Sequence, residues 1–502
     1  MKKHAPLVLA LLLVTLAAWA AGENAPTFSR SRWIAEQRAW GARFSAGVLP
    51  ADRERLQELV DSPGAQRPAR RQPAPHFTRI SNDLLAPDGG PAEPETQAEP
   101  SVAVDPQQDN HLLAGYQENR FDTGGARALA YAVSRDSARD WSEGLVPGLT
   151  LASGGSHERA SDPWVAFGPG GRAYFSSLLF NETSRPNGVY VSVSANGGTT
   201  WGEPVAVHTT SAELDDKDSV VVDNRSDSPF RGRVYVGWDT VTTDQQQPVR
   251  IAYSADGGAS YTPFVTLLAR GANIGVIPLV GPGGVVHAIW VRFNSNDAAT
   301  LMTARSEDGG DNWTAPAIIA QLHTAGVPDS RTADGLPSAA IDPRTGDLYV
   351  VWQDDRFSPG VDQVLLSRSS DGGDTWSEPH LVSDGPLDAP NFTPALAVNG
   401  NGVVGVAYYS LRNDPGRHTF ADEYLAVSRD RGQHFASTRM SPLAWDVGFA
   451  AVADGGFFLG DYQGLAANRK TFFPVWIATF LRSRIDSSRP EPDAFTWPLQ
   501  VR

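Results

Sequence analysis

The chain of 502 residues contains no cysteine. Disulfide bonds are therefore excluded, and so is the attachment of a lipid through a cysteine thiol. A fold without covalent cross-links depends on the burial of apolar surface and on the closure of its own sheets or helices. More than 400 residues follow the N-terminal segments, which is ample for one large domain with its own core.

A membrane-spanning segment is also lacking in our interpretation of the sequence. Residues 1–20 begin with Lys2 and Lys3, continue with an apolar run from about Leu7 and end in Ala18-Trp19-Ala20. This order is typical of an export signal with a small-x-small cleavage site, and it is too short for a membrane anchor. The sequence predicts a protein that is exported to the periplasm or the extracellular space.

Positive charge is in deficit, with 42 Lys and Arg against 57 Asp and Glu and a formal net charge of −15. Nucleic acid and anionic membranes attract basic proteins. The balance therefore argues against either of them as the main partner.

One short motif, Ser-x-Asp-x-Gly-x-x-(Trp/Tyr/Phe), occurs six times. The copies begin at Ser134, Ser194, Ser254, Ser306, Ser369 and Ser428. The first copy has Ala138 in place of Gly, and the second has Asn196 in place of Asp. Each copy follows a strand-like apolar run and predicts a β-hairpin corner. The Asp side chain would accept backbone N–H groups, the Gly would supply a positive φ, and the aromatic ring would fill the seam between sheets.

The spacing of the motifs predicts a β-propeller. Successive copies start 60, 60, 52, 63 and 59 residues apart, which suits one four-stranded blade per repeat. Residues 77–502 contain about 7.2 such periods, so seven blades are favoured and six are the alternative. The inner strands are expected at residues 101–105, 164–167, 219–223, 276–280, 338–342, 395–398 and 463–467. Residues 77–80 are expected to pair with a strand near residues 495–497 and so close the ring.

The region before the propeller differs in composition. Residues 26–76 are rich in Arg, and Trp33, Trp40 and Phe44 recur at helical spacing. We expect one or two helices lying on the propeller, joined to it by Pro-rich connectors. The predicted organisation is a signal peptide at residues 1–20, a helical and Pro-rich extension at 21–76 and the propeller at 77–502.

The candidate functional residues lie on the face opposite the motif turns. The segments that lead into the inner strands and the loops between second and third strands are rich in charge there. Carboxylates in such a funnel suit acid–base work on a glycosidic bond, and arginines suit a clamp on an anionic sugar. The alternative is that these side chains form ion pairs that stabilise their own loops and have no role in function. The candidate substrate-binding residues are Arg120, Arg292, Arg356, Arg412 and Asp355.

No cofactor is expected from the sequence, with one open alternative. Asp215, Asp216 and Asp218 offer oxygen ligands that suit Ca²⁺. Their spacing is not that of an EF-hand loop, and a solvated acidic loop is the other interpretation.

The six motifs, the export signal and the repeat layout resemble the sialidase superfamily of Asp-box (BNR) propellers, over about residues 77–480. The resemblance implies three arginines on the substrate carboxylate, an Asp acid/base, and a Tyr nucleophile activated by a Glu. Asp461-Tyr462 is similar to the Tyr-bearing strand of the family's last blade, which implies Tyr462 as nucleophile beside Asp461. Asp122 takes the acid/base place. The family's first arginine belongs to an Arg-Ile-Pro opening, and here Ala98-Glu99-Pro100 stands at that position.

Three functions remain open from the sequence. The first is a secreted, sialidase-like glycoside hydrolase acting on extracellular glycans. The second is a propeller that binds carbohydrate or protein without turnover. The third and weaker one is a polysaccharide lyase. The missing Arg-Ile-Pro arginine favours the binding propeller or a neutral substrate over sialidase chemistry. In each case we expect a monomer with a glycan or protein as its ligand.

Overall fold

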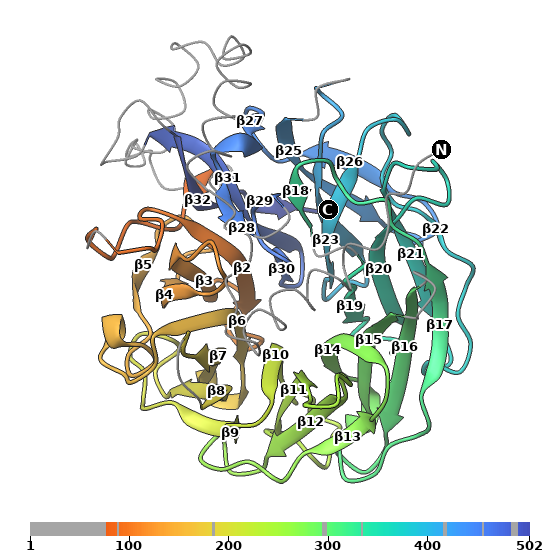
Figure 1. The fold of residues 1–502 in the computed structure, drawn as a ribbon. Helices are drawn as coiled ribbons and strands as arrows, with labels where there is room; N and C mark the ends of the chain where they lie inside the picture. The colour runs from red at the N-terminus through yellow and green to blue at the C-terminus, as the bar shows by residue number, and fades with distance from the viewer. Residues whose placement is uncertain are drawn as a thin grey trace, which may run out of the picture.

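The computed structural model describes residues 77–87, 90–182, 186–293, 299–332, 335–414, 419–453, 456–482 and 490–501. Antiparallel sheets follow one another around a central axis in chain order, from the orange strands near residue 100 to the blue strands near residue 480 (Figure 1). The protein is therefore an all-β propeller. The predicted signal peptide and the predicted helical extension lie outside the described residues.

The propeller is built from four-stranded groups in which each strand pairs with the next in sequence. The first group contains β2 (Gln97–Val104), β3 (Leu112–Arg120), β4 (Ala126–Ser134) and β5 (Ser142–Leu145), and the second contains β6 (Arg159–Phe167), β7 (Ala173–Phe180), β8 (Asn187–Ser194) and β9 (Val205–Thr210). The pair Ala126–Ala160 joins these two groups into one sheet. The third group contains β10 (Leu214–Val222), β11 (Val234–Val241), β12 (Val249–Ser254) and β13 (Val265–Leu268), and the fourth contains β14 (Ala272–Val280), β15 (Val286–Phe293), β16 (Ala299–Ser306) and β17 (Ala317–Leu322).

Two further groups follow the same order. One contains β19 (Ser338–Ile341), β20 (Leu348–Asp354), β21 (Gln363–Ser369) and β22 (His380–Leu381), and the other contains β23 (Asn391–Val398), β24 (Val404–Ser410), β25 (Phe420–Ser428) and β26 (Ala436–Arg439), with β27 (Trp445–Asp446) at the other end of β25. The first strand of every group faces the centre of the ring (Figure 1). Short 3-10 turns η1 to η4 occupy Leu151–Ser153, Pro169–Gly171, Pro282–Gly284 and Val447–Phe449.

The last sheet is closed by both ends of the described chain. Its order is β30 (Gly464–Ala467), β31 (Thr471–Arg482), β32 (Pro490–Thr496) and β1 (Thr78–Arg79), and β33 (Leu499–Gln500) also pairs with β31. Thr78 lies opposite Thr496, and Arg79 lies opposite Phe495. The ring of Phe77 stacks on that of Phe495 with 5.2 Å between centroids. The predicted pairing of residues 77–80 with the last sheet is confirmed.

A small additional sheet joins segments that are distant in the sequence. The strand β18 (Ser330–Arg331) runs parallel to β29 (Gly456–Phe458), which pairs with β28 (Ala451–Ala453). Phe458 and Ala453 pack on Ala98 at the start of β2. This sheet carries Arg331 towards the strands of the first and last groups.

The second strands of the groups carry large side chains that are fully buried. Trp238, Trp290, Trp352 and Trp476 are all completely buried on these strands. Neighbouring groups meet closely there, because a Cβ atom on Gly405 of β24 would lie 2.4 Å from the ring of Phe472 on β31. The glycine therefore sets the spacing between these two sheets.

The six motifs all form the turn between third and fourth strands, and they share one hydrogen-bond pattern. In the copy at Ser369, the hydroxyl accepts from the Gly373 N–H at 2.9 Å and donates to Asp371 at 2.8 Å. The Asp371 carboxylate accepts from the Thr375 N–H at 2.9 Å. Trp376 is half-buried at a seam formed by residues of the fourth and fifth groups. The predicted seam position holds, although the ring is only partly covered.

The inner strands begin four or five residues earlier than the sequence pattern predicts in five of the groups. The cause is a β-bulge near the start of each of these strands, where the ladder shifts at 98/101, 161/164, 216/219, 274/277 and 392/395. A bulge interrupts the alternation of apolar and polar residues, so the sequence pattern stops at it.

None of the described residues belongs to a helix of the length and apolarity that a bilayer crossing requires.

Candidate functional site

The bulges bring charged side chains to the centre of the propeller. Glu99 on β2, Asp162 on β6 and Lys217 on β10 occupy the bulges with φ values of 52°, 52° and 47°. Left-handed backbone is costly for residues other than Gly, and it persists where surrounding contacts enforce it. The corresponding residue of β14 is Gly275, which carries no side chain. The charge therefore gathers on the side of the ring that β2, β6 and β10 line.

Lys217 is the hub of these charges. Its Nζ atom lies 2.6 Å from Asp461, 3.0 Å from Asp162 and 3.7 Å from Glu99. The lysine side chain is 10% exposed, and the three carboxylates are at most 2% exposed. The sequence holds only four lysines, so a lysine here contrasts with the arginines that make most other ion pairs. A compact ammonium with three donors can serve three carboxylates at once.

A second cation reaches the same carboxylate from the small sheet. Arg331 on β18 donates from Nε and Nη2 to the two oxygens of Asp461, at 3.1 and 2.7 Å. Its guanidinium lies 5.1 Å from the ring centroid of Phe458, and that of Arg120 lies 4.0 Å from the same ring. We call Glu99, Asp162, Lys217, Arg331 and Asp461 the central cluster.

Arg120 joins the central cluster through an amide. It donates to the Gln117 carbonyl oxygen at 2.5 Å, and the Gln117 amide donates to Glu99 and, at 2.9 Å, to Ser161. Burial lowers the pKa of Arg120 to about 10 despite the nearby Glu99. Arg120 therefore acts on Glu99 through Gln117 and through its charge.

The pKa values of two carboxyls of the central cluster are shifted in opposite directions. Burial raises the pKa of Glu99 to about 7, and the neighbouring Lys217 only partly offsets this. Burial also raises the pKa of Asp461, but the charges of Arg331 and Lys217 outweigh it and hold that pKa well below its usual value. Near neutral pH, Glu99 is therefore able to take up or release a proton while Asp461 stays ionised.

Further acids around the central cluster favour their protonated forms. Burial raises the pKa of Asp216 to about 6 against the pull of Lys217. Burial and the charge of Asp162 raise the pKa of Asp218 well above its usual range. Burial and the charge of Asp216 do the same to the pKa of Asp239. The centre is thus crowded with carboxyls that cannot all ionise together.

Tyr462 lies at the edge of this centre. Its hydroxyl donates to the Pro163 carbonyl at 3.2 Å, and its ring packs against Trp164 at 5.1 Å between centroids. Burial raises its pKa well above the usual value, and among the charges Glu99 contributes most, followed by Asp162. The resting phenol is therefore protonated, and it would need a base to become a nucleophile.

The structure brings together three of the residues predicted from the sequence, namely Tyr462, Asp461 and Arg120. The other five lie elsewhere. Arg356 donates to both oxygens of Asp354, and Asp355 lies 2.7 Å from His323 Nδ1.

Arg412 and Arg292 also make contacts within their own regions. Arg412 donates to Asp384 at 2.9 Å and stacks 3.9 Å from the ring centroid of Tyr424, and Arg292 lies opposite Asn273 in the β14–β15 ladder. Asp122 is half-buried in the turn after β3. Among the described residues, no hydrogen bond or ion pair that we find joins any of these five to the central cluster.

The acidic run considered for Ca²⁺ is divided between two surroundings. Asp215 lies 2.7 Å from His208 Nδ1 and accepts from Thr240 at 2.7 Å. The pKa values of Asp216 and Asp218 are instead shifted by charges of the central cluster, among them those of Asp162 and Lys217. Ca²⁺ binding by this run stays a prediction.

The site residues predicted from the sequence include Asp461 but not the other four members of the central cluster, which are Glu99, Asp162, Lys217 and Arg331. Lys217 interrupts an acidic run and is one of the few lysines, which is the signal that would have singled it out. Arg331 lies on a strand of two residues whose partner is 127 positions away, and no local pattern marks such a strand.

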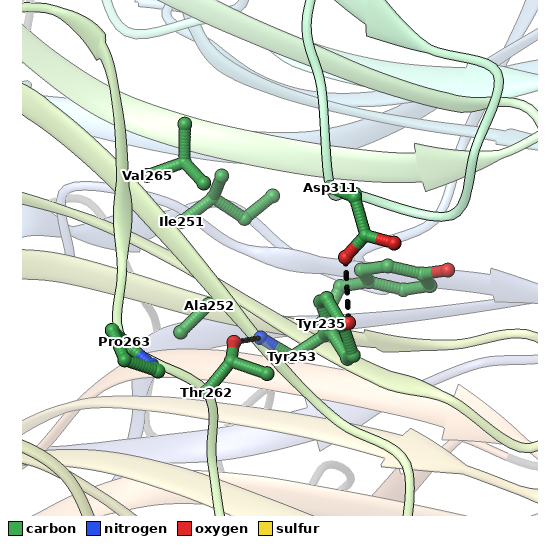
Figure 2. Close-up of a pocket in the computed structure, with 9 residues that line it drawn as sticks. Tyr235, Ile251, Ala252, Tyr253, Thr262, Pro263, Val265 and Asp311 are labelled. Carbon is green, nitrogen blue, oxygen red and sulfur yellow. Dashed lines mark hydrogen bonds between the residues drawn. The ribbon is translucent and has the colours of Figure 1, made fainter.

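A separate cavity of about 90 Å³ lies between the third and fourth groups (Figure 2). It is lined by Tyr235, Ile251, Ala252, Tyr253, Thr262, Pro263, Val265, Gly310 and Asp311. Gly310 and Asp311 belong to a motif turn, and the Tyr253 hydroxyl donates to Asp311 at 2.7 Å. Since none of its lining residues belongs to the central cluster, the cavity is not part of the candidate site.

Comparison with known proteins gave partial matches. No protein-family model matches the sequence. A curated relative, a sialidase of Bacteroides fragilis (strain YCH46), is 25% identical over 237 residues, which are 43% of this chain and 39% of that protein. The match therefore spans well under half of the relative's length.

The solved structures that match this chain share little sequence with it. The Hadza microbial sialidase Hz136 is 14% identical, with 78% of this chain and 76% of that chain covered and a TM-score of 0.44. A Trypanosoma rangeli sialidase in complex with 2,3-difluorosialic acid is 14% identical, with 85% and 58% covered and a TM-score of 0.45. A Penicillium chrysogenum α-L-arabinanase complexed with arabinobiose is 12% identical, with 68% and 93% covered and a TM-score of 0.42.

Proposed function

We propose that this protein is an exported glycoside hydrolase whose reaction takes place at the central cluster. The observation that carries the proposal is the contrast between Glu99, whose pKa is raised to about 7, and Asp461, which is held ionised. Lys217 contacts both of them. Glycosidases use two carboxyls of this kind, one that exchanges a proton and one that stays charged. The partial match to a sialidase supports the same class of reaction.

In the proposed reaction Tyr462 attacks the anomeric carbon while its phenolic proton passes to Glu99. The glycosidic bond breaks, and the leaving oxygen takes a proton from an acid. The sialidase resemblance gives this role to Asp122, which lies in the turn after β3 outside the central cluster and would have to reach the leaving oxygen from there. Water then releases the sugar from Tyr462 by the reverse proton movements. This role requires the Tyr462 hydroxyl to leave the Pro163 carbonyl, to which it donates in the resting structure.

Asp461 would act through its charge. It stays ionised between Arg331 and Lys217 and would offset the positive charge that develops on the sugar ring. Lys217 and Arg331 would in turn fix its position.

The charge around the centre favours a neutral sugar over a sialic acid. Both oxygens of Asp461 already occupy the planar fork of Arg331, so a substrate carboxylate would have to compete for it. Arg120 is turned towards Gln117. Sialidase-type chemistry would require Arg331 to leave Asp461 and Arg120 to leave Gln117, so that both can bind a substrate carboxylate. Hydrolysis of sialyl as against neutral glycosides distinguishes the two cases.

A second candidate is a propeller that binds a glycan or a protein without turnover. The observation that favours it is the mutual satisfaction of Lys217, Arg331 and Asp461, which is also what a purely structural ion-pair network looks like.

We further propose that the propeller has seven blades. The four-stranded groups that begin at β2, β6, β10, β14, β19, β23 and β30 support this count. β1 supplies the fourth strand of the last group.

The test is hydrolysis of chromogenic sialyl, arabinosyl, xylosyl and uronic-acid glycosides by the purified mature protein. We expect release from a neutral sugar, with loss of turnover in Glu99→Gln and in Tyr462→Phe. Arg356→Lys is the matched control, because Arg356 lies outside the central cluster. Release from no substrate would favour the binding propeller, and full activity of Tyr462→Phe would remove this residue from the mechanism.

A further inference from the structure

Gln117 is the residue through which the second strand of the first group reaches Glu99. It lies on β3 opposite Ala98, directly beside the bulge that carries Glu99. Its side chain is completely buried. The amide Nε2 donates to Oε2 of Glu99 and, at 2.9 Å, to Ser161 Oγ, and the amide Oε1 accepts from Arg120 Nη1 at 2.5 Å. Both polar atoms of this amide therefore have partners.

Arg120 fixes which end of the amide points to Glu99. A guanidinium has five donors and no acceptor, so only the oxygen of the Gln117 amide can face it. The nitrogen end must then face Glu99 and Ser161. If the two ends exchanged places, a nitrogen would lie against the guanidinium and an oxygen against the Glu99 carboxylate, and both contacts would be repulsive.

The contact between Gln117 and Arg120 depends on an irregular backbone. In a regular strand, residues three positions apart point to opposite faces. Asn119 lies between them with a φ of 56°, and its N–H donates to the Thr96 carbonyl at 2.9 Å. The Arg120 N–H donates to Thr96 Oγ1 at 2.8 Å. Left-handed backbone persists where surrounding contacts enforce it, so Thr96 holds the turn that brings Arg120 back to Gln117.

The two oxygens of Glu99 consequently have different surroundings. Oε2 accepts from Gln117 and lies 3.5 Å from Ser161 Oγ, whereas Oε1 lies 3.7 Å from Lys217 Nζ. A donor that points at a carboxylate oxygen favours the ionised form and occupies the place that a proton on that oxygen would need.

We propose that Gln117 is a positioning residue that holds Oε2 of Glu99 and leaves Oε1 to take the proton of Tyr462. In this step the phenolic O–H bond breaks and an O–H bond forms at Oε1. The inference rests on the proposed hydrolase function, in which Glu99 is the base. It adds the residue that orients this base and the oxygen that exchanges the proton.

Loss of the Gln117 donor should change the proton affinity of Glu99. The charged and titratable groups that act on Glu99 are Arg120 on β3, Asp162 on β6, Lys217 on β10, Arg331 on β18, and Asp461 and Tyr462 before β30. Without the amide, the ionised form loses one donor, so the pKa of Glu99 should rise above about 7. One hydrogen bond to a charged group corresponds to about one pH unit.

The first test is the pH profile of Gln117→Glu. This substitution keeps the size of the side chain and the acceptor for Arg120, but it places an oxygen where the donor to Glu99 was. A base must be ionised to act, so the acid limb of kcat/KM should move to higher pH by about one unit, with kcat reduced at neutral pH and KM near wild type. Gln117→Met, which adds no charge, should move the limb in the same direction. A loss of activity that is equal at every pH would mean that Gln117 only supports the fold, and would overturn the proposal.

Urea unfolding against pH gives a second test that needs no substrate. Stability that depends on the Glu99 proton is lost as the pH rises through the folded-state pKa, so this loss should occur about one pH unit higher in Gln117→Met than in the wild type. In a Glu99→Gln background, Gln117→Met should cause no such shift. Gln363→Met is the matched control, because it removes another completely buried amide, one that donates to the Ala389 carbonyl and should leave the pH dependence unchanged.

Equal pH dependence in the wild type and Gln117→Met would overturn the proposal, and so would a shift that persists in the Glu99→Gln background. The two proposals can fail separately. A wild type that hydrolyses no glycoside would overturn the proposed hydrolase function, while a shifted unfolding curve would still show that Gln117 acts on Glu99. An active protein whose acid limb stays in place in both Gln117 variants would retain the hydrolase function and remove Gln117 from it.

Discussion

The ammonium of Lys217 and the carboxylate of Asp461 are 2.6 Å apart, although 244 residues separate them in the sequence. Lys217 belongs to the third strand group, and Asp461 precedes the first strand of the closing group. This ion pair therefore links two distant sheets across the centre of the propeller. Its burial makes it both a structural element and the part of the candidate site that mutation can probe most directly.

Lys217→Met should destabilise the protein strongly. The substitution keeps most of the side-chain volume but leaves Asp461, Asp162 and Glu99 without their shared cation. Removing one partner of a buried ion pair costs about 3–5 kcal/mol. Urea unfolding at neutral pH measures this loss in the free energy of unfolding.

The control for this prediction is Lys217→Arg, which retains the charge. It should recover part of the stability, because an arginine can still pair with Asp461 but cannot reproduce the compact three-way contact. A loss of less than about 1 kcal/mol in Lys217→Met is typical of an exposed ion pair, and it would contradict the burial that we assign to this pair.

Stability should fall as the pH rises from about 5 to about 8, and Glu99 should account for part of the change. Its pKa of about 7 exceeds its ordinary value of 4.5 because burial disfavours the charged form. The folded protein therefore binds this proton more tightly than the unfolded chain does. The contribution to stability is fully present below pH 4.5 and is lost as the pH rises through 7, at up to about 1.4 kcal/mol per pH unit.

Urea unfolding of the wild type and of Glu99→Gln at several pH values checks this. The variant should show a shallower decline, since the amide does not titrate. Glu378→Gln, which alters an exposed carboxylate, should keep the wild-type slope. Equal slopes in the wild type and Glu99→Gln would mean that Glu99 titrates near its ordinary pKa.

The features that the sequence predicted well are those encoded over short distances. The turn at Ser369 depends on Asp371 and Gly373, which lie within four residues, and such turns recur with a regular period. The repeat then predicts the propeller and the place of its hairpins. The pairing of Phe77 and its neighbours with the last sheet follows from the same logic, because a closed ring must join its two ends.

The features that the sequence did not predict depend on contacts between distant segments. Arg331 meets Asp461 across 130 positions through a strand of only two residues. Glu99 and Asp162 lie within strands, at bulges where a charged residue replaces the expected apolar one, so a period of two misplaced the strand starts. Strand patterns describe burial, and the central cluster is where burial and charge coincide.

Substitution of two glycines should separate spacing from backbone strain. A Cβ on Gly405 would lie 2.4 Å from the Phe472 ring, so Gly405→Ala must push two sheets apart at a cost of about 1–3 kcal/mol or more. A Cβ on Gly373 meets Leu348 at 3.5 Å, an ordinary contact, and the cost there is the left-handed backbone of about 1–2 kcal/mol. The first motif already tolerates Ala138 at this position with a φ of 69°.

Thermal unfolding of both alanine variants measures the difference. Gly373→Ala should fold with a modest loss in Tm, whereas Gly405→Ala should lose more. If Gly405→Ala is the milder of the two, the close approach of β24 and β31 is not what limits this position.

Deletion of residues 77–82 should prevent stable ring closure. The deletion removes β1, exposes the edge of β32 and uncovers Phe495, on which Phe77 stacks. Exposed strand edges pair with other chains, so the truncated protein should aggregate. Light scattering and size-exclusion chromatography test this, with Phe77→Ala as a milder variant that keeps the strand and loses about 3–5 kcal/mol. A truncated protein that stays monomeric with an unchanged Tm would contradict the closure.

Two arginines with the same local geometry allow the site to be tested against its surroundings. Arg331 and Arg356 each donate from Nε and Nη2 to both oxygens of one aspartate, which is Asp461 for the first and Asp354 for the second. Substitution by lysine removes the planar two-point contact in both cases and keeps the charge. Only Arg331 belongs to the central cluster.

Arg331→Lys should therefore weaken turnover or glycan binding by at least tenfold, because Asp461 loses its fixed orientation and its pKa rises towards its ordinary value. Arg356→Lys should leave both properties near wild type. Kinetics on the best substrate of the panel, or calorimetry with a glycan ligand if no substrate is turned over, measures the two variants alongside their Tm values. A loss of function in Arg356→Lys alone would place the functional centre in the loop after β20 instead of at the central cluster, and a comparable loss in both variants would mean that the effect is not specific to the central cluster.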